Sequence, residues 1–398
     1  MSEPVAGYLQ RFRTAMVLRI VAVLVLAALP FYLDTALEQV GLFAFSAAIA
    51  AIGLNLLTGT TGQLSLGHAF FIAIGAYGYA YFSGGGELDT GAGLQLPPLL
   101  ALVLAVLLSG MCGLIFSPIA SRLRGIYLGI ASLALIFIGQ HIFFTAGPVT
   151  GGFNGRNIAP FSLGAFTFTS ANPPLTVLGV PFGQYERLWY LGLVLLVLAY
   201  LFAKNLLRGR PGRAMQAVRD SEVAGAVMGV NIRRYKAAAF VISSMYAGLG
   251  GAVYALTVSH VVPDSFGFTF TIGFLAMIVI GGLGSVGGAV IGAFFVSALP
   301  QLLTQYSDAI PFLSQPGTPG GVDAGSFAGY IYGALMVLIL LFQPEGLAGI
   351  GRRLSGRRAR SPGTSVEQGG GGARPAAAND SPSDPVDTPP SRASSSHQ

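Results

Sequence analysis

The chain has 398 residues, of which 53% are hydrophobic and only 10% are charged. Because soluble domains carry about a quarter charged residues, this composition excludes an ordinary soluble enzyme. The mean hydropathy is +0.67 and the formal net charge is +6, which is typical of a membrane protein with basic loops. A single cysteine, Cys112, and scattered histidines predict neither a disulfide nor a metal site. We therefore expect an all-α integral membrane protein.

Ten apolar runs follow one another along the chain and predict about ten transmembrane helices. The eighth run is short, so we expect either a tilted helix that extends into the following glycines or a half-helix. The predicted spans are Thr14–Leu33, Val40–Leu57, Leu64–Phe82, Leu96–Ala120, Gly125–Ala146, Leu188–Ala203, Ala237–Ser259, Phe270–Ile280, Ala289–Leu303 and Ser326–Phe342.

The placement of Lys and Arg predicts the orientation of these spans. With both termini in the cytoplasm, most of the 22 basic residues lie in cytoplasmic segments, as the positive-inside rule requires. This bias needs an even number of crossings, so segment 270–303 is expected to reverse direction rather than cross once. The predicted domains are a cytoplasmic N-terminus (1–13), a transmembrane domain (14–345) with an outer loop (147–187) and a cytoplasmic loop (204–236), and a cytoplasmic basic stretch with a disordered tail (346–398).

No energy source for transport is visible in the chain itself. The sequence has no G-x-x-x-x-G-K-[ST] phosphate loop, so we expect no bound ATP and no other cofactor in this chain. No Asp or Glu falls in the middle of a predicted span, where proton- or sodium-coupled carriers place an acid. Both observations favour energy from a partner protein. We predict no catalytic residue.

The cytoplasmic loop 204–236 contains a short helix with recognisable ends. Asp220 or Ser221 is a candidate N-cap, Glu222 places an acid in the first turn, and Gly229 provides a left-handed stop. Such a helix fits a groove of a soluble partner, but an interfacial helix in a basic loop explains the arginines equally well, and the sequence leaves both open. The small apolar face consists of Val223, Ala224, Val227 and Met228.

Four stretches of the chain, in the same order, resemble the permease subunits of branched-chain amino acid ABC importers, and the LivM-type subunit in particular. The stretches are Leu54–Tyr77, Gly212–Leu256, Pro263–Ala293 and Phe342–Gly349. The stretch Leu54–Tyr77 carries the pattern G-Q-x-S-x-G-H-A-x-F.

The resemblance implies a multi-pass subunit of the bacterial inner membrane, surrounded by lipid. Its implied partners are a homologous second permease, two ATPase subunits that carry the ATP, and an extracytoplasmic solute-binding protein; no nucleic acid is expected. The loop departs from the importers' E-A-A-x-x-x-G pattern, because Val223 follows Glu222 and Gly229 lies seven residues after Glu222 rather than six. The residues that the resemblance assigns to ATPase coupling are Arg219, Asp220, Glu222, Ala224, Met228 and Gly229.

A pathway for a zwitterion with an apolar side chain should be mildly polar and without fixed strong charge. The segment 55–68 fits this description, and a helix that began inside the membrane there would point free N–H groups at the pathway. Interhelical hydrogen bonding explains the same polar residues, and for His68 the two interpretations are equally weighted. The glycine run at 281–288 loosely matches an earlier run formed by Gly59, Gly62 and Gly67, and this match suggests an internal repeat. The pathway candidates are Asn55, Gln63, Ser65, His68, Gly281 and Gly284.

These observations predict a permease that imports branched-chain or related amino acids as half of an ABC transporter. The nearest alternative is a urea or short-amide permease, because urea permeases share these glycine motifs. A stand-alone secondary carrier or channel is a further alternative, but it would need the mid-membrane acid or sodium site that the sequence lacks. A membrane scaffold without transport is disfavoured by the glycine motifs and the coupling-like loop.

Overall fold

A computed structural model describes residue 17 and residues 20–85, 93–164, 166–168, 175–177, 180–306, 313–314, 322–343 and 346–349. All of them belong to one compact unit, Met1–Arg357. The predicted N-terminal segment 1–13 and tail from 350 onward lie outside the described residues, as do parts of the loop 147–187.

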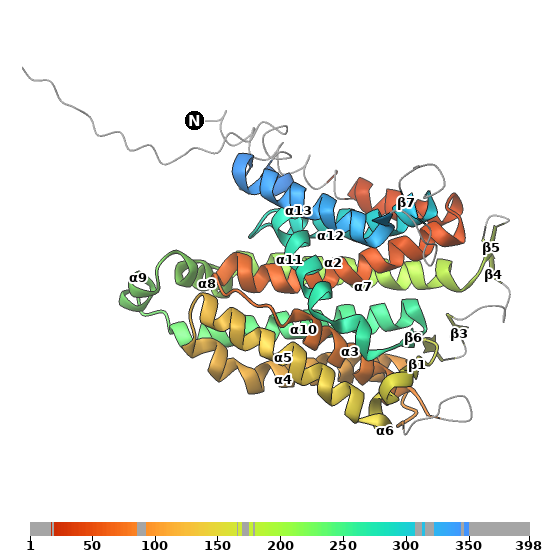
Figure 1. Cartoon of the computed structure of the whole chain (residues 1–398), viewed down its shortest axis with the longest axis horizontal. Coiled ribbons are helices and arrows are strands. Elements are labelled where there is room, and N and C mark those ends of the chain that lie inside the picture. Colours follow the sequence, from red (N-terminus) through yellow and green to blue (C-terminus); the bar gives the residue numbers. More distant parts are fainter. Residues whose placement is uncertain are drawn as a thin grey trace, which may run out of the picture. The chain divides into compact units, whose positions relative to one another are not determined.

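Each of the ten predicted spans contains a helix in the described part of the chain (Figure 1). Six of these helices, namely α2, α4, α5, α7, α10 and α12, are long and apolar enough to cross a membrane. The chain is therefore a multi-pass, mainly helical membrane protein. The helices are Ile20–Phe31, α2 (Thr35–Thr61), α3 (His68–Ser83), α4 (Pro98–Arg122), α5 (Ile126–Thr145), α7 (Gln184–Arg208), α10 (Ile232–Val258), α11 (Phe268–Gly281), α12 (Val286–Gln305) and α13 (Ala324–Phe342).

Short elements gather at the two ends of the helical bundle (Figure 1). One end carries α8 (Arg210–Asp220) and α9 (Glu222–Val227), and we call it the α9 end. The opposite end, the β6 end, carries α6 (Gly147–Thr150) and the pairing of β1 (Arg156–Asn157) with β6 (His260–Val261). The remaining short elements are η1 (Leu29–Phe31), η2 (Gly152–Asn154), η3 (Pro263–Phe266), β2 (Ser162–Leu163), β3 (Phe166–Thr167), β4 (Leu175–Val177), β5 (Val180–Phe182), β7 (Leu313–Ser314) and β8 (Val322–Asp323).

Helix α2 is the centre of the bundle. It is apolar on all sides and almost entirely buried, with Phe45, Ile49 and Ile52 fully enclosed, as expected for a helix without a polar face. It packs against α7, α10 and α12, while α4 and α5 lie farther out and expose side chains such as Ile115 and Phe137. These exposed apolar side chains are expected where helices face lipid.

Small residues let the central helices approach closely. Gly75 on α3 lies directly against Gly248 on α10, and a Cβ on Gly75 would overlap the Gly248 backbone. Gly251 contacts the backbone of Ile72 in the same way. This packing of small residues is typical of membrane helices, whose association depends on close backbone contact.

The structure shows the predicted reversal in segment 270–303. Helices α11 and α12 run antiparallel and are joined by a turn in which Gly282 and Gly284 have φ values of 112° and 78°. Gly281 and Gly288 lie backbone to backbone across this hairpin. Glycine is required at both features, because a Cβ would be strained at such φ angles and would fill the space between the two helices.

The predicted span 64–82 begins too early. Helix α3 starts at His68, and residues 62–67 are not helical. Gly62 ends α2 in the left-handed conformation, with φ of 70°. The helix therefore begins inside the bundle, after an irregular segment that hydropathy alone does not distinguish from helix.

Candidate functional site

Helix α9 is held by defined caps. Ser221, rather than Asp220, is its N-cap, because its Oγ accepts a hydrogen bond from the Ala224 N–H (3.2 Å). At the other end, Gly229 has φ of 81°, and its N–H donates to the Ala226 carbonyl. The next N–H, of Val230, reaches the Gly225 carbonyl, which completes a Schellman motif. The predicted left-handed stop at Gly229 is confirmed.

The apolar face of α9 is exposed. Val223, Val227 and Met228 are 77%, 84% and 69% exposed, and Ala224 is also exposed. A Cβ added at Gly229 would meet no other atom. This end of the molecule therefore presents a rigid apolar tip to its surroundings.

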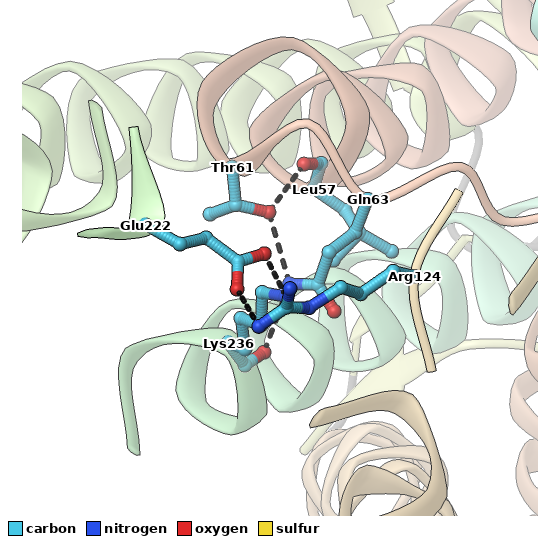
Figure 2. Close-up of polar contacts among 6 residues, drawn as sticks. All are labelled: Leu57, Thr61, Gln63, Arg124, Glu222 and Lys236. Atoms are coloured by element: carbon cyan, nitrogen blue, oxygen red, sulfur yellow. Dashed lines mark hydrogen bonds and ion pairs between the residues drawn. The ribbon is translucent and has the colours of Figure 1, made fainter. Parts of the chain in front are cut away.

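Glu222 connects α9 to the bundle through two ion pairs (Figure 2). Its Oε1 lies 2.5 Å from Lys236 Nζ, at the start of α10, and its Oε2 lies 2.8 Å from an Nη2 of Arg124, between α4 and α5. The Lys236 side chain is only 5% exposed, whereas that of Arg124 is 77% exposed. Glu222 is therefore more important for Lys236 than for Arg124. The buried Lys236 ammonium group has little water around it that could replace Glu222 as its partner.

The same cluster continues to the end of α2 (Figure 2). Gln63 Nε2 donates to the Lys236 carbonyl (3.2 Å) and to Thr61 Oγ1 (2.9 Å), and Thr61 Oγ1 donates to the Leu57 carbonyl (2.7 Å). Gln63 thus links α2 to α10. Together with the Glu222–Lys236 ion pair, it connects α9 to α2 at the centre of the bundle.

Arg219, on α8, makes a second connection. Its Nη1 donates to the carbonyl of Gly59 in the last turns of α2 (2.8 Å), and its Nε donates to Asp220 Oδ1 (3.2 Å). Asp220 itself is largely exposed. The Arg219 side chain also lies beside Gly284 in the α11–α12 turn.

The two glycine runs of the sequence meet at this point. The Asn55 side chain bridges them, because its Nδ2 donates to the Ser285 carbonyl and its Oδ1 accepts from the Gly284 N–H, both at 2.8 Å. A Cβ on Gly59 would overlap the Gly284 backbone, so only glycine permits this approach. We call this contact of Asn55 and Gly59 with Gly284 and Ser285 the glycine crossing.

Two hydroxyl groups that the sequence analysis missed accept hydrogen bonds from the backbone of the irregular segment before α3 and of the first turn of α3. The Leu66 N–H donates to Ser132 Oγ on α5 (2.8 Å), and the Ala69 N–H donates to Thr271 Oγ1 on α11 (3.2 Å). Both hydroxyls are fully buried. Irregular backbone at membrane depth is tolerated only where protein satisfies it, as here. In the sequence, the available indication of these contacts was a single hydroxyl side chain within an otherwise apolar predicted span.

The remaining pathway candidates also make contacts within the protein. His68 is 1% exposed, its Nε2 lies 2.9 Å from the Ala50 carbonyl, and its ring packs edge-on against Phe274. Ser65 is buried too, and its Oγ has no hydrogen-bond partner among the described residues. Asn55 and Gly284 lie at the glycine crossing, Gly281 lies against Gly288 at the end of α11, and His68 and Ser65 lie in and beside the start of α3.

A cavity of about 490 Å³ lies between α2, α3, α10, α11, α12 and α13. It extends from Asp264 and Thr269, which are exposed near the β6 end, to Ala50 and Met277 inside the bundle. Along α11, Thr269 and Met277 are eight residues apart, which is about 12 Å at 1.5 Å per residue. None of the six predicted pathway candidates lines the cavity. Helix α11 ends at Gly281, about one helical turn beyond Met277, and the glycine crossing at Gly284 follows in the α11–α12 turn.

The described residues contain no group of three or more His, Cys, Asp or Glu side chains that could hold a metal ion. What they provide is a cavity, a closely packed crossing beside it, and hydrogen bonds that tie this crossing to an exposed helix.

Comparison with known sequences gives the family. The model of the family described as "Branched-chain amino acid transport system / permease component" matches residues 36–340. The chain belongs to this family. The matched permease region begins in the first turn of α2 and reaches the last turn of α13, so it includes the cavity, the glycine crossing and α9. No solved structure matches the chain.

The relatives are named as import permeases, but for more than one kind of solute. The high-affinity branched-chain amino acid permease LivM of Escherichia coli K12 is 31% identical over 340 residues, which cover 82% of this chain and 74% of that protein. BraD, a high-affinity branched-chain amino acid transport system permease of Pseudomonas aeruginosa, is 24% identical over 76% of this chain and 91% of its own length. The ribose import permease RbsC of Escherichia coli K12 is 26% identical over 61% of this chain and 67% of its own length. As a permease component, the chain is a transport subunit and not an enzyme.

Proposed function

We propose that this permease imports branched-chain or related apolar amino acids as one of two homologous permeases of an ABC transporter. The observation that carries the proposal is the exposed apolar face of α9, on a helix fixed to the bundle by Glu222 and Arg219. A buried apolar patch at the centre of an interface contributes most of its binding free energy, so this face fits a groove on an ATPase subunit.

Motion of the ATPase would reach the transport pathway through two connections. From α9, Glu222 pairs with Lys236, whose carbonyl is bound by Gln63. From α8, Arg219 bonds to Gly59, which lies against Gly284. Both connections converge on the end of α2 and on the glycine crossing. A displacement of α8 and α9 would therefore open or close the crossing, while ATP itself stays on the partner chains and this chain carries no cofactor.

The proposed topology has ten crossings with both termini in the cytoplasm of a bacterial cell, in the inner membrane. The α9 end then faces the cytoplasm, and the β6 end faces the extracytoplasmic solute-binding protein. The transmembrane domain is 14–345, with the outer loop 147–187 and the coupling loop 204–236. The α2–α3 and α11–α12 pairs, each joined at a glycine turn, support an internal repeat.

The names of the relatives favour amino acids over urea or short amides as the solute. A stand-alone carrier or channel would have no use for the exposed α9 face, and it is the weaker alternative.

The α9 face can be tested without disturbing the fold. Val227→Glu places a charge at a position that is 84% exposed, so the variant should still insert and fold. We expect it to lose co-purification of the ATPase and ATP-driven uptake. Phe153→Glu, at an 80% exposed position in η2 at the β6 end, is the matched control and should keep the ATPase. Retention of the ATPase by the Val227→Glu protein would refute the docking assignment.

A further inference from the structure

The cavity between α2, α3, α10, α11, α12 and α13 has no role in the coupling contacts described above. We propose that it is a binding site for the zwitterionic apolar α-amino acid during transport, with Asp264 binding the ammonium group. The proposal rests on the proposed import function and deepens it, because it places the solute within this chain.

The volume and walls of the cavity suit a small apolar group. At about 490 Å³ it falls within the range of roughly 300–1,000 Å³ that is usual for small-molecule sites. Its walls are mainly apolar and include the rings of Phe43, Tyr254, Phe270, Phe274 and Tyr332. Aromatic rings bind aliphatic side chains by contact over a large area, so these walls favour a branched aliphatic group.

The polar groups of the lining are distributed as a zwitterion requires. Asp264 is the one charged residue among those that line the cavity, and it lies at the exposed end. The neutral donors Thr269, Ser297 and Gln301 also line it and are available for a carboxylate. An anionic solute would face Asp264 without a cation to offset it, and urea would leave the aromatic walls unused. The ammonium group would therefore stay near the exposed end while the side chain points inward.

Gly273 gives the cavity its width on the α11 side. It lines the cavity, and a Cβ added there would meet no atom within 4 Å. A larger side chain at this position would thus enter the cavity rather than strain the helix. This makes Gly273 a suitable position for filling the site in steps.

The test uses the whole transporter, with its ATPases, second permease and binding protein, in proteoliposomes. Uptake of L-leucine and L-alanine is measured for Gly273→Ala, Gly273→Val and Gly273→Phe, together with ATP hydrolysis. We expect Gly273→Phe to lower leucine uptake at least tenfold, and Gly273→Val to reduce leucine uptake more than alanine uptake, because a methylene in an apolar pocket changes selectivity about 10-fold or more. Gly329→Phe, on α13 outside the lining and equally free of neighbours, should leave uptake unchanged.

A charge variant tests the ammonium site separately. Asp264→Asn should lower leucine uptake at least tenfold with ATP hydrolysis retained, whereas Asp34→Asn, an exposed acid before α2 that does not line the cavity, should not. Full leucine uptake by both Gly273→Phe and Asp264→Asn would overturn the proposal. Loss of the second permease from the Gly273→Phe complex would also overturn it, because the cavity would then be a subunit interface. A wild-type chain that binds no ATPase would instead contradict the proposed function.

Discussion

Replacing Asn55 by leucine is expected to loosen the glycine crossing. The Asn55 side chain is 2% exposed and makes two hydrogen bonds of 2.8 Å, to the Ser285 carbonyl and from the Gly284 N–H. Interhelical hydrogen bonds in membrane proteins contribute about 0.6 kcal/mol on average and up to ~1.7 kcal/mol. The loss of both bonds should therefore lower the free energy of unfolding by about 1–3 kcal/mol.

The single tryptophan of the chain makes this measurable. Trp189 is 2% exposed on α7, so its fluorescence reports unfolding of the purified protein in SDS. Thr60→Val is the matched control on the same helix, because Thr60 Oγ1 donates only to the Leu56 carbonyl of its own helix and its loss should change stability little. Unfolding of the Asn55→Leu and Thr60→Val proteins at the same SDS fraction would refute the assignment of stability to the crossing.

Three further predictions concern the coupling contacts and the tail. Glu222→Gln should lower the free energy of unfolding by about 1–3 kcal/mol in the same SDS assay, because Lys236 keeps only a neutral acceptor, and an unchanged midpoint would contradict this. Arg219→Met should retain ATP hydrolysis but lose uptake in proteoliposomes, because its hydrogen bond to Gly59 is removed. A normal amount of uptake per ATP hydrolysed would show that this bond does not couple hydrolysis to transport. Deletion of Ser361–Gln398, a segment with few large apolar residues, should leave uptake intact, and a large loss would assign the tail a function.

The sequence was sufficient for features whose cause is local. Long apolar runs predicted a helix in each expected region, Gly229 predicted the end of α9, and the basic loops predicted the reversal between α11 and α12. The start of α3 was predicted four residues too early, because residues 64–67 are as apolar as a helix but are not helical. Their backbone is satisfied by Ser132 and Thr271 from distant helices, which no local pattern reveals.

Contacts between distant segments could not be predicted. Asn55 was selected as a candidate for its polarity, but its partner Gly284 is 229 residues away. Glu222 was selected for its place in α9, and its pairing with Lys236 depends on how α9 folds back onto α10. The cavity arises from six helices together, and a single sequence does not specify which of their faces converge.

The most direct test of the account is to purify this chain from its native membrane and identify the bound proteins by mass spectrometry. The account predicts a second homologous permease and ATPase subunits, with the ATPase absent from the Val227→Glu preparation. A homo-oligomer of this chain without any ATPase would contradict it.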